Sequence, residues 1–161
     1  GSTRPTVSED DVKAAEQYAV APFSEEGGEN PYTIQHDLQQ SMNDLVGIIR
    51  TAAELEQSLE AIEAFKVRAK HLQVEGHRQY NPGWHLALDL RNMLLVSESI
   101  ARAALERQES RGGHTREDFP GPDPEWGSKN LVVRLDDTGE AVALNPQPLP
   151  PMPDDLKKFF E

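Results

Sequence analysis

The sequence predicts an all-α fold, a three-helix up-and-down bundle, followed by an extended, proline-rich C-terminal tail that contains a β-hairpin. Three observations support this prediction. Apolar residues recur at helical spacing in three successive segments, and a helix-start signal precedes each segment. Eight of the twelve prolines fall in the last third of the chain, which excludes helix from most of that region.

The chain divides into three predicted regions. Residues 1–29 hold a lead-in helix and a linker, and the opening Gly1-Ser2 resembles what remains after cleavage of a purification tag. Residues 30–110 form the predicted bundle. Residues 111–161 hold a polar loop, the hairpin and the extended tail. Ser8, followed by three acidic residues, starts the lead-in helix, and Pro22 ends it.

The first bundle helix starts at Asn30-Pro31, where a capping side chain precedes a proline at the first helical position. Its expected buried stripe is Ile34, Leu38, Met42, Leu45 and Ile49.

The second bundle helix starts at Thr51, because Glu54 three residues later completes a capping box, and Gly76 closes it. Its expected buried stripe is Leu55, Leu59, Ile62, Ala69 and Leu72.

The third bundle helix starts at Asn81-Pro82 and runs to about Glu109. Its expected buried stripe is Leu86, Leu90, Met93, Leu94, Ile100, Ala101, Ala104 and Leu105. Short connections between three amphipathic helices predict antiparallel neighbours. In the tail, residues 131–135 and 141–144 flank Asp136-Asp137-Thr138-Gly139, which predicts a hairpin.

Composition limits the function. The chain has 161 residues, enough for one domain, and 16 Lys and Arg against 28 Asp and Glu give a net charge of -12. This sign disfavours nucleic acid and direct membrane insertion. The absence of cysteine excludes disulfides and thiolate metal sites, and we expect a cytoplasmic protein.

The densest polar segment runs from Glu109 to Asp118 and includes a glycine pair, two arginines and a histidine. Such groups can bind an anion or perform acid–base chemistry. The alternative, which the spacing favours, is a helix C-cap followed by local ion pairs. No histidine shows metal-ligand spacing, and neither glycine pair matches a phosphate-binding loop. We therefore predict no catalytic, cofactor or metal residue in this chain.

Three ordered segments resemble one known family. Residues 109–120, ESRGGHTREDFP, with Asp123 and Trp126 beyond them, resemble the E-S-R-G-[AG]-H-x-R-x-D-[FY]-P…W signature near the C-terminus of succinate dehydrogenase and fumarate reductase flavoprotein subunits. Residues 42–50, MNDLVGIIR, resemble the M-x-x-x-V-G-I-x-R motif of the first bundle helix. Residues 91–94, RNML, resemble the helix that leads into the signature.

The resemblance implies that this chain is the C-terminal domain, a spectrin-repeat-like bundle with its tail, of a longer parent. FAD is expected in the parent and not in this fragment, which should be inactive. Implied partners are the N-terminal flavin-binding and capping domains of the same parent chain and an iron–sulfur subunit. The parent would convert succinate and fumarate by hydride transfer to FAD, pass electrons to quinone, and lie peripherally on the cytoplasmic face of the membrane.

The signature positions are expected to lock the bundle onto the rest of the parent. They are Arg111, Gly112, Gly113, His114, Arg116, Asp118 and Trp126. In that case alanine at Arg111 or Asp118 would leave the melting temperature of this chain alone nearly unchanged. Two alternatives remain open: the C-terminal domain of L-aspartate oxidase, and a free-standing helical adapter whose acidic face and proline-rich tail bind proteins.

Overall fold

The computed structural model describes residues 6–136, 141–157 and 159, so Gly1-Ser2 and turn residues 137–139 lie outside the described part. Helices dominate, but the fold is not purely all-α, which corrects the predicted class, because the described residues also form two two-stranded sheets. The α-helices are α1 (Glu9–Val20), α2 (Pro31–Leu45), α3 (Ala52–Arg68), α4 (Pro82–Glu106) and α5 (Asp154–Lys157). Short 3-10 helices cover Ala21–Phe23, Ala69–His71 and Trp126–Ser128.

The chain forms two compact units, and the border between them crosses two helices. Unit 1 comprises residues 1–44 and 60–97, and unit 2 comprises residues 45–59 and 98–161. The borders fall inside α3 and α4, so each of these helices contributes to both units. No helix of the described residues combines the length and the hydropathy needed to cross a membrane.

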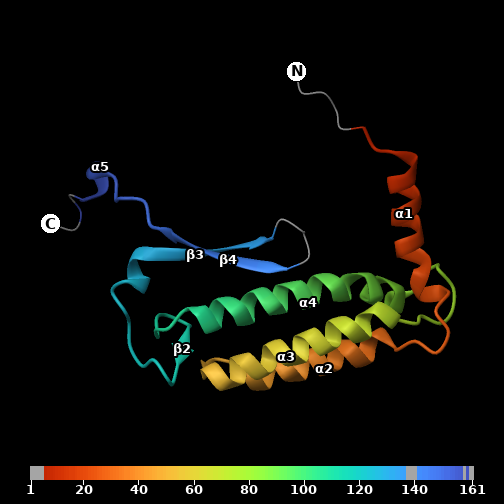
Figure 1. Cartoon of the computed structure of the whole chain (residues 1–161), viewed down its shortest axis with the longest axis horizontal. Helices are drawn as coiled ribbons and strands as arrows, with labels where there is room; N and C mark the ends of the chain where they lie inside the picture. Colours follow the sequence, from red (N-terminus) through yellow and green to blue (C-terminus); the bar gives the residue numbers. More distant parts are fainter. Residues whose placement is uncertain (1–5, 137–140, 158, 160–161) are drawn as a thin grey trace. The chain divides into compact units, whose positions relative to one another are not determined.

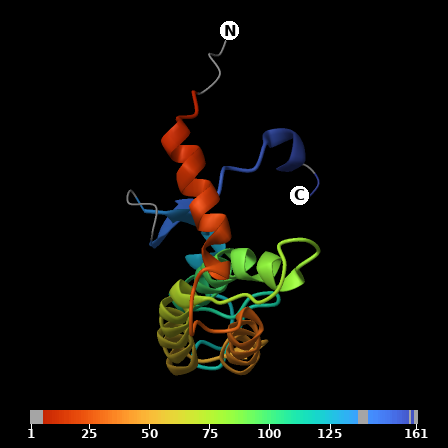
Figure 2. The same ribbon diagram turned by 90° about the vertical axis from the view of Figure 1, so that its right-hand side faces the viewer.

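The core of unit 1 draws on all three long helices. Ile34 of α2 and Leu90 of α4 are fully buried, and Phe65 of α3 packs against the same cluster. Trp84 joins this core, meets Phe23 edge to face at 5.4 Å, and donates from its indole nitrogen to the carbonyl of Ala19 at 2.6 Å. These contacts anchor the end of α1, whereas α1 itself buries no residue and points away from the other helices of this unit (Figures 1 and 2).

The predicted helix starts are confirmed by their capping contacts. Ser8 and Asp11 form a capping box at α1, and Thr51 and Glu54 form another at α3. At α4, the Asn81 side-chain oxygen accepts the Trp84 amide at 3.1 Å. These caps satisfy backbone N–H groups that have no partner inside the helix.

Two predicted stripe positions are wrong. The first bundle helix ends at Leu45 instead of continuing to Ile49, because the chain bends and Ile49–Arg50 forms strand β1. Ile49 is therefore 59% exposed, and Ile100 on α4 is 46% exposed. The helices also stop short elsewhere, since α3 changes to a 3-10 helix at Ala69 and α4 ends at Glu106.

Unit 2 contains both sheets. Strand β1 (Ile49–Arg50) pairs in parallel with β2 (Thr115–Arg116), a contact that periodicity did not predict. Strands β3 (Lys129–Leu135) and β4 (Val142–Pro148) pair antiparallel, with Val133 opposite Leu144, which confirms the predicted strand pairing (Figure 1). Strand β4 continues beyond the predicted Leu144 to Pro148, and a two-stranded sheet has only edge strands, where proline is tolerated.

Candidate functional site

Glu109 is the centre of a buried polar network just after α4. Its side chain is fully buried and accepts from Arg107, from Arg111 Nε at 3.0 Å and from the Asp123 amide at 2.8 Å. The Arg111 hydrogen bond, outweighing burial, lowers the pKa of Glu109 to about 2. Glu109 is therefore charged at neutral pH and connects the end of α4 to the loop around Asp123.

Arg116 and Asp118 connect the ends of two helices. Arg116 is 1% exposed and donates to the carbonyls of Ala104 and Leu105 at 2.8 and 3.0 Å, at the C-terminal end of α4. Its guanidinium also pairs with both Asp118 oxygens at 2.8 and 2.7 Å. Asp118 in turn accepts the Ala52 amide at 3.0 Å, at the start of α3. A cation thus lies at a helix C-terminus and an anion at a helix N-terminus, as the helix dipole favours.

The Arg116 contact holds Asp118 in its charged form. The hydrogen bond from Arg116 is the largest cause that lowers the pKa of Asp118, to about 2, against the opposing effect of burial. Alanine at Asp118 would remove the carboxylate from a buried guanidinium. The expectation that such a change leaves this chain's stability unchanged is therefore not supported by these contacts.

His114 is held as a neutral ring. Its Nε2–H donates to the Arg107 carbonyl at 3.0 Å, and its Nδ1 accepts from Arg50 Nη1 at 2.9 Å. Burial and the charges of the surrounding arginines lower the pKa of His114, although the Arg107 carbonyl opposes them. Because both ring nitrogens are engaged, this histidine is not free to act as an acid or a base.

Trp126 and Gly127 complete the network. Arg107 and Lys129 lie 5.2 and 4.5 Å from the centre of the Trp126 ring, at cation–π distance. A Cβ at Gly127 would come within 2.8 Å of Arg111 Nη2, so a side chain there would force that guanidinium to shift.

The structure brings most of the predicted signature residues into one network, but it does not involve the glycine pair in it. Gly112 has φ 59, a backbone conformation that favours glycine, in the two-residue turn between Arg111 and His114. Gly113 is exposed, and a Cβ at this position would have no neighbour within 4 Å. Spacing in the sequence assigns no role to four further charged residues of the network, which are Arg50, Arg107, Glu109 and Asp123. Their charges, within or near the quoted motifs, were the sequence feature that could have indicated a role.

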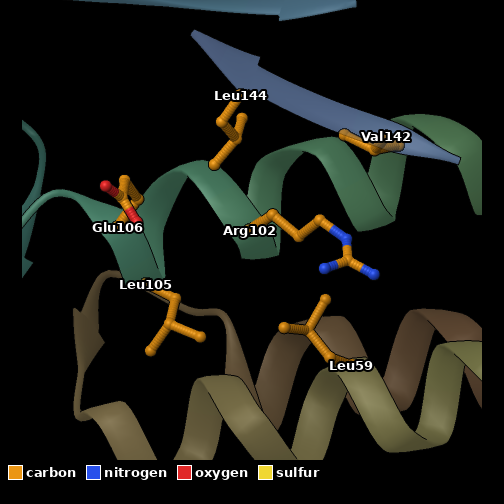
Figure 3. A pocket seen from close by; sticks show the side chains of 6 residues that line it. All are labelled: Leu59, Arg102, Leu105, Glu106, Val142 and Leu144. Atoms are coloured by element: carbon orange, nitrogen blue, oxygen red, sulfur yellow. The ribbon is translucent and has the colours of Figure 1, made fainter. Parts of the chain in front are cut away.

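A pocket of about 270 Å³ also lies in unit 2 (Figure 3). It is lined by Leu59, Arg102, Leu105, Glu106, Val142 and Leu144. Figure 3 shows the Arg102 side chain reaching into the space below β4. Its Nε donates to the buried Glu98 carboxylate at 2.6 Å. The lining is mainly aliphatic, so this pocket offers packing surface and no group of converging reactive side chains.

The described residues were compared with the arrangements that hold a metal ion or a dinucleotide. They place no group of three or more histidine and carboxylate side chains where a metal ion could be held. Gly112-Gly113 lies in a tight turn between Arg111 and His114, whereas the glycine pair of a dinucleotide-binding loop opens a helix after a strand. The network's guanidinium–carboxylate pairs favour the predicted alternative of a helix C-cap with local ion pairs.

Comparison with known proteins identifies the family. The model of the C-terminal region of fumarate reductase flavoproteins matches residues 35–153. The chain belongs to this family. The resemblance to succinate dehydrogenase and fumarate reductase flavoprotein subunits is therefore confirmed, and the signature network just described is part of the matched region.

Individual proteins that are similar to this chain include members of the same flavoprotein family. The chain is 49% identical to a chain of the Mycobacterium smegmatis Sdh1 complex, with a TM-score of 0.91 over 99% of this chain and 28% of that one. It is 32% identical to the fumarate reductase flavoprotein subunit of Helicobacter pylori, over 75% of this chain and 17% of the relative. It is 39% identical to L-aspartate oxidase of Acinetobacter baylyi, over 52% of this chain and 14% of the relative. The chain thus spans less than a third of the length of these relatives.

Proposed function

We propose that this chain is the C-terminal domain of a longer flavoprotein subunit that interconverts succinate and fumarate by hydride transfer to FAD. Electrons then pass through an iron–sulfur subunit to quinone. The observation that carries this proposal is the match to the Sdh1 chain, which extends over 99% of this chain at 49% identity. In this proposal the part of the parent outside this chain holds the flavin, and the tight Gly112-Gly113 turn, which differs from a dinucleotide-binding loop, supports that assignment.

Within the parent, this domain acts as a scaffold. In the proposed organisation, α2, α3 and α4 form a three-helix up-and-down bundle over residues 30–110, after a lead-in over residues 1–29. The signature loop, hairpin and tail follow over residues 111–161. Support comes from the core of unit 1, to which all three helices contribute. The signature network connects the C-terminal end of α4 to the loop that follows it, through Arg116 and Asp118. In this proposal, that connection keeps the following segments in a fixed position against the neighbouring domains.

The parent complex is proposed to lie peripherally on the cytoplasmic face of the membrane. The partners in this proposal are the N-terminal flavin-binding and capping domains of the same chain and the iron–sulfur subunit. The solved Sdh1 structure is a complex, which supports a multi-subunit parent. The net charge of -12 gives this domain no attraction of its own for anionic lipid.

Turnover by the purified parent complex tests the proposal. We expect succinate to reduce an artificial electron acceptor, and a reduced dye to drive the reverse reaction with fumarate. The second candidate, L-aspartate oxidase, is favoured only by the 39% identity over about half of this chain. Turnover with L-aspartate and none with succinate would select that candidate. If succinate, fumarate and L-aspartate all give no turnover, the free-standing helical adapter is the alternative that remains.

A further inference from the structure

Two exposed isoleucines and a half-buried arginine form a corner in unit 2, which we name the β1 corner (Ile48, Ile49 and Arg50). Ile48 is 79% exposed and Ile49 is 59% exposed, although large aliphatic side chains normally bury most of their surface. Strand pairing sets Ile49 beside Thr115, Arg50 Nη1 lies 2.9 Å from His114, and His114 closes the turn with Arg111. The corner therefore lies next to the Gly112-Gly113 turn.

Arg50 is positioned but not neutralised. Its Nε donates to the Gly47 carbonyl at 2.7 Å, and its Nη1 donates to His114 at 2.9 Å, so two contacts orient the guanidinium. The other arginines of the network have carboxylate partners, in Glu109 or Asp118. Across the described part of the chain, no carboxylate lies within ion-pair distance of Arg50. Its remaining N–H donors are fixed in a geometry that suits a carboxylate.

Gly113 adds an independent observation. Unlike Gly112, it does not adopt the left-handed conformation that requires glycine, and a Cβ there would meet nothing within 4 Å. This chain alone therefore has room for a side chain at position 113. A glycine at an exposed turn, next in sequence to the His114 that Arg50 contacts, suits the close approach of another backbone.

We propose that the β1 corner and the Gly113 turn form a docking surface for a carboxylate-bearing segment of the parent chain outside residues 1–161. This deepens the proposed function and rests on it. In the proposed contact an Asp or Glu of that segment pairs with Arg50, aliphatic side chains cover Ile48 and Ile49, and the backbone passes over Gly113. The domain-facing residues would then be Arg50 and Gly113, whereas Arg116 and Asp118 hold this chain together internally.

The occupant follows from charge and from chain length. A guanidinium with no internal counter-charge, flanked by aliphatic side chains, is complementary to an acidic residue on an otherwise apolar segment. The match to the Sdh1 chain covers 99% of this chain but 28% of the Sdh1 chain. Most of the Sdh1 polypeptide therefore lies outside the matched region.

Photo-crosslinking in the purified parent complex tests the occupant. A benzophenone amino acid replaces Ile48, and in a matched control it replaces Tyr80, which is 93% exposed and lies in unit 1. We expect the probe at position 48 to attach to a peptide from the rest of the same polypeptide, and the control probe to give no such adduct. Attachment to a second copy, to another subunit or only within residues 1–161, or no adduct at all, would overturn the proposal.

Paired variants test the energetics. Gly113→Leu should leave the melting temperature of this 161-residue chain unchanged, because the position is open. In the parent it should speed proteolytic separation of the domain roughly tenfold, the effect of losing one central contact. Ile48→Glu should act likewise by placing a charge on the apolar part of the β1 corner, whereas Ile100→Glu should have no effect. Equal behaviour of the Gly113→Leu and unchanged parents would contradict the proposed surface.

Failure of this proposal and failure of the proposed function give different results. Crosslinking and proteolysis use no substrate, so a parent that attaches at position 48 but does not oxidise succinate would contradict only the activity. A parent that oxidises succinate but attaches nowhere in its own remainder would contradict only the docking surface.

Discussion

Replacing Arg116 should destabilise this chain strongly, although the residue lies in the two-residue strand β2 beyond the last long helix. In Arg116→Met, the aliphatic part of the side chain remains while the guanidinium is lost. The Ala104 and Leu105 carbonyls then lose their donor, and the Asp118 carboxylate keeps only backbone donors, among them the Ala52 amide.

The magnitude follows from these contacts. Removing one partner of a buried ion pair costs about 3–5 kcal/mol, and we expect the lower end because the Asp118 side chain is 30% exposed. In a chain of this size each kcal/mol shifts the melting temperature by roughly 2–4 °C, so a loss of about 3 kcal/mol corresponds to roughly 6–12 °C.

Urea unfolding and thermal melts followed by circular dichroism measure this loss. Arg134→Met is the matched control, since Arg134 is an exposed residue on β3 of the same unit, and its effect should stay within about 0.5 kcal/mol. By the same conversion from free energy to melting temperature, a value for Arg116→Met within about 2 °C of the Arg134→Met control would show that Arg116 does not join the ends of α3 and α4.

Further predictions concern the same network and the α1 anchor. Gly127→Ala should lower the urea midpoint by displacing the Arg111 guanidinium, whereas Gly113→Ala should not; equal midpoints would argue against the close approach at position 127. The free energy of unfolding should fall as pH drops from about 4.5 to about 2, because the folded pKa of Glu109 is depressed and its stabilisation is lost on protonation. Glu109→Gln should flatten that acid dependence, which acid titration of unfolding would detect. Trp84→Phe removes the hydrogen bond to α1 and should expose α1 to protease at least several-fold faster, and an unchanged cleavage pattern would show that this bond is dispensable.

The helix starts could be predicted because their determinants are local. Ser8, Thr51 and Asn81 each act on backbone groups within three residues, so their spacing is visible in the sequence. The helix ends were less predictable. Ile49 fits the apolar repeat of α2, but pairing with Thr115, far along the chain, places it in a strand instead.

The candidate site was only partly predictable for the same reason. The motif match located Arg111, His114 and Arg116, but it could not tell which of them face inward. Burial of Arg116 depends on carbonyls at the end of α4 and on a carboxylate that also caps α3. Those contacts arise only when the loop folds back, and no periodicity encodes them.

Flavin content tests the central claim most directly, namely that this chain is a scaffold of a flavoprotein and does not itself hold the cofactor. The purified parent complex and the 161-residue chain would each be desalted and their bound FAD measured by absorbance after denaturation. If the claim holds, the parent contains stoichiometric FAD and this chain contains none, even after incubation with excess FAD. Retention of FAD by this chain, or a parent without FAD, would contradict it.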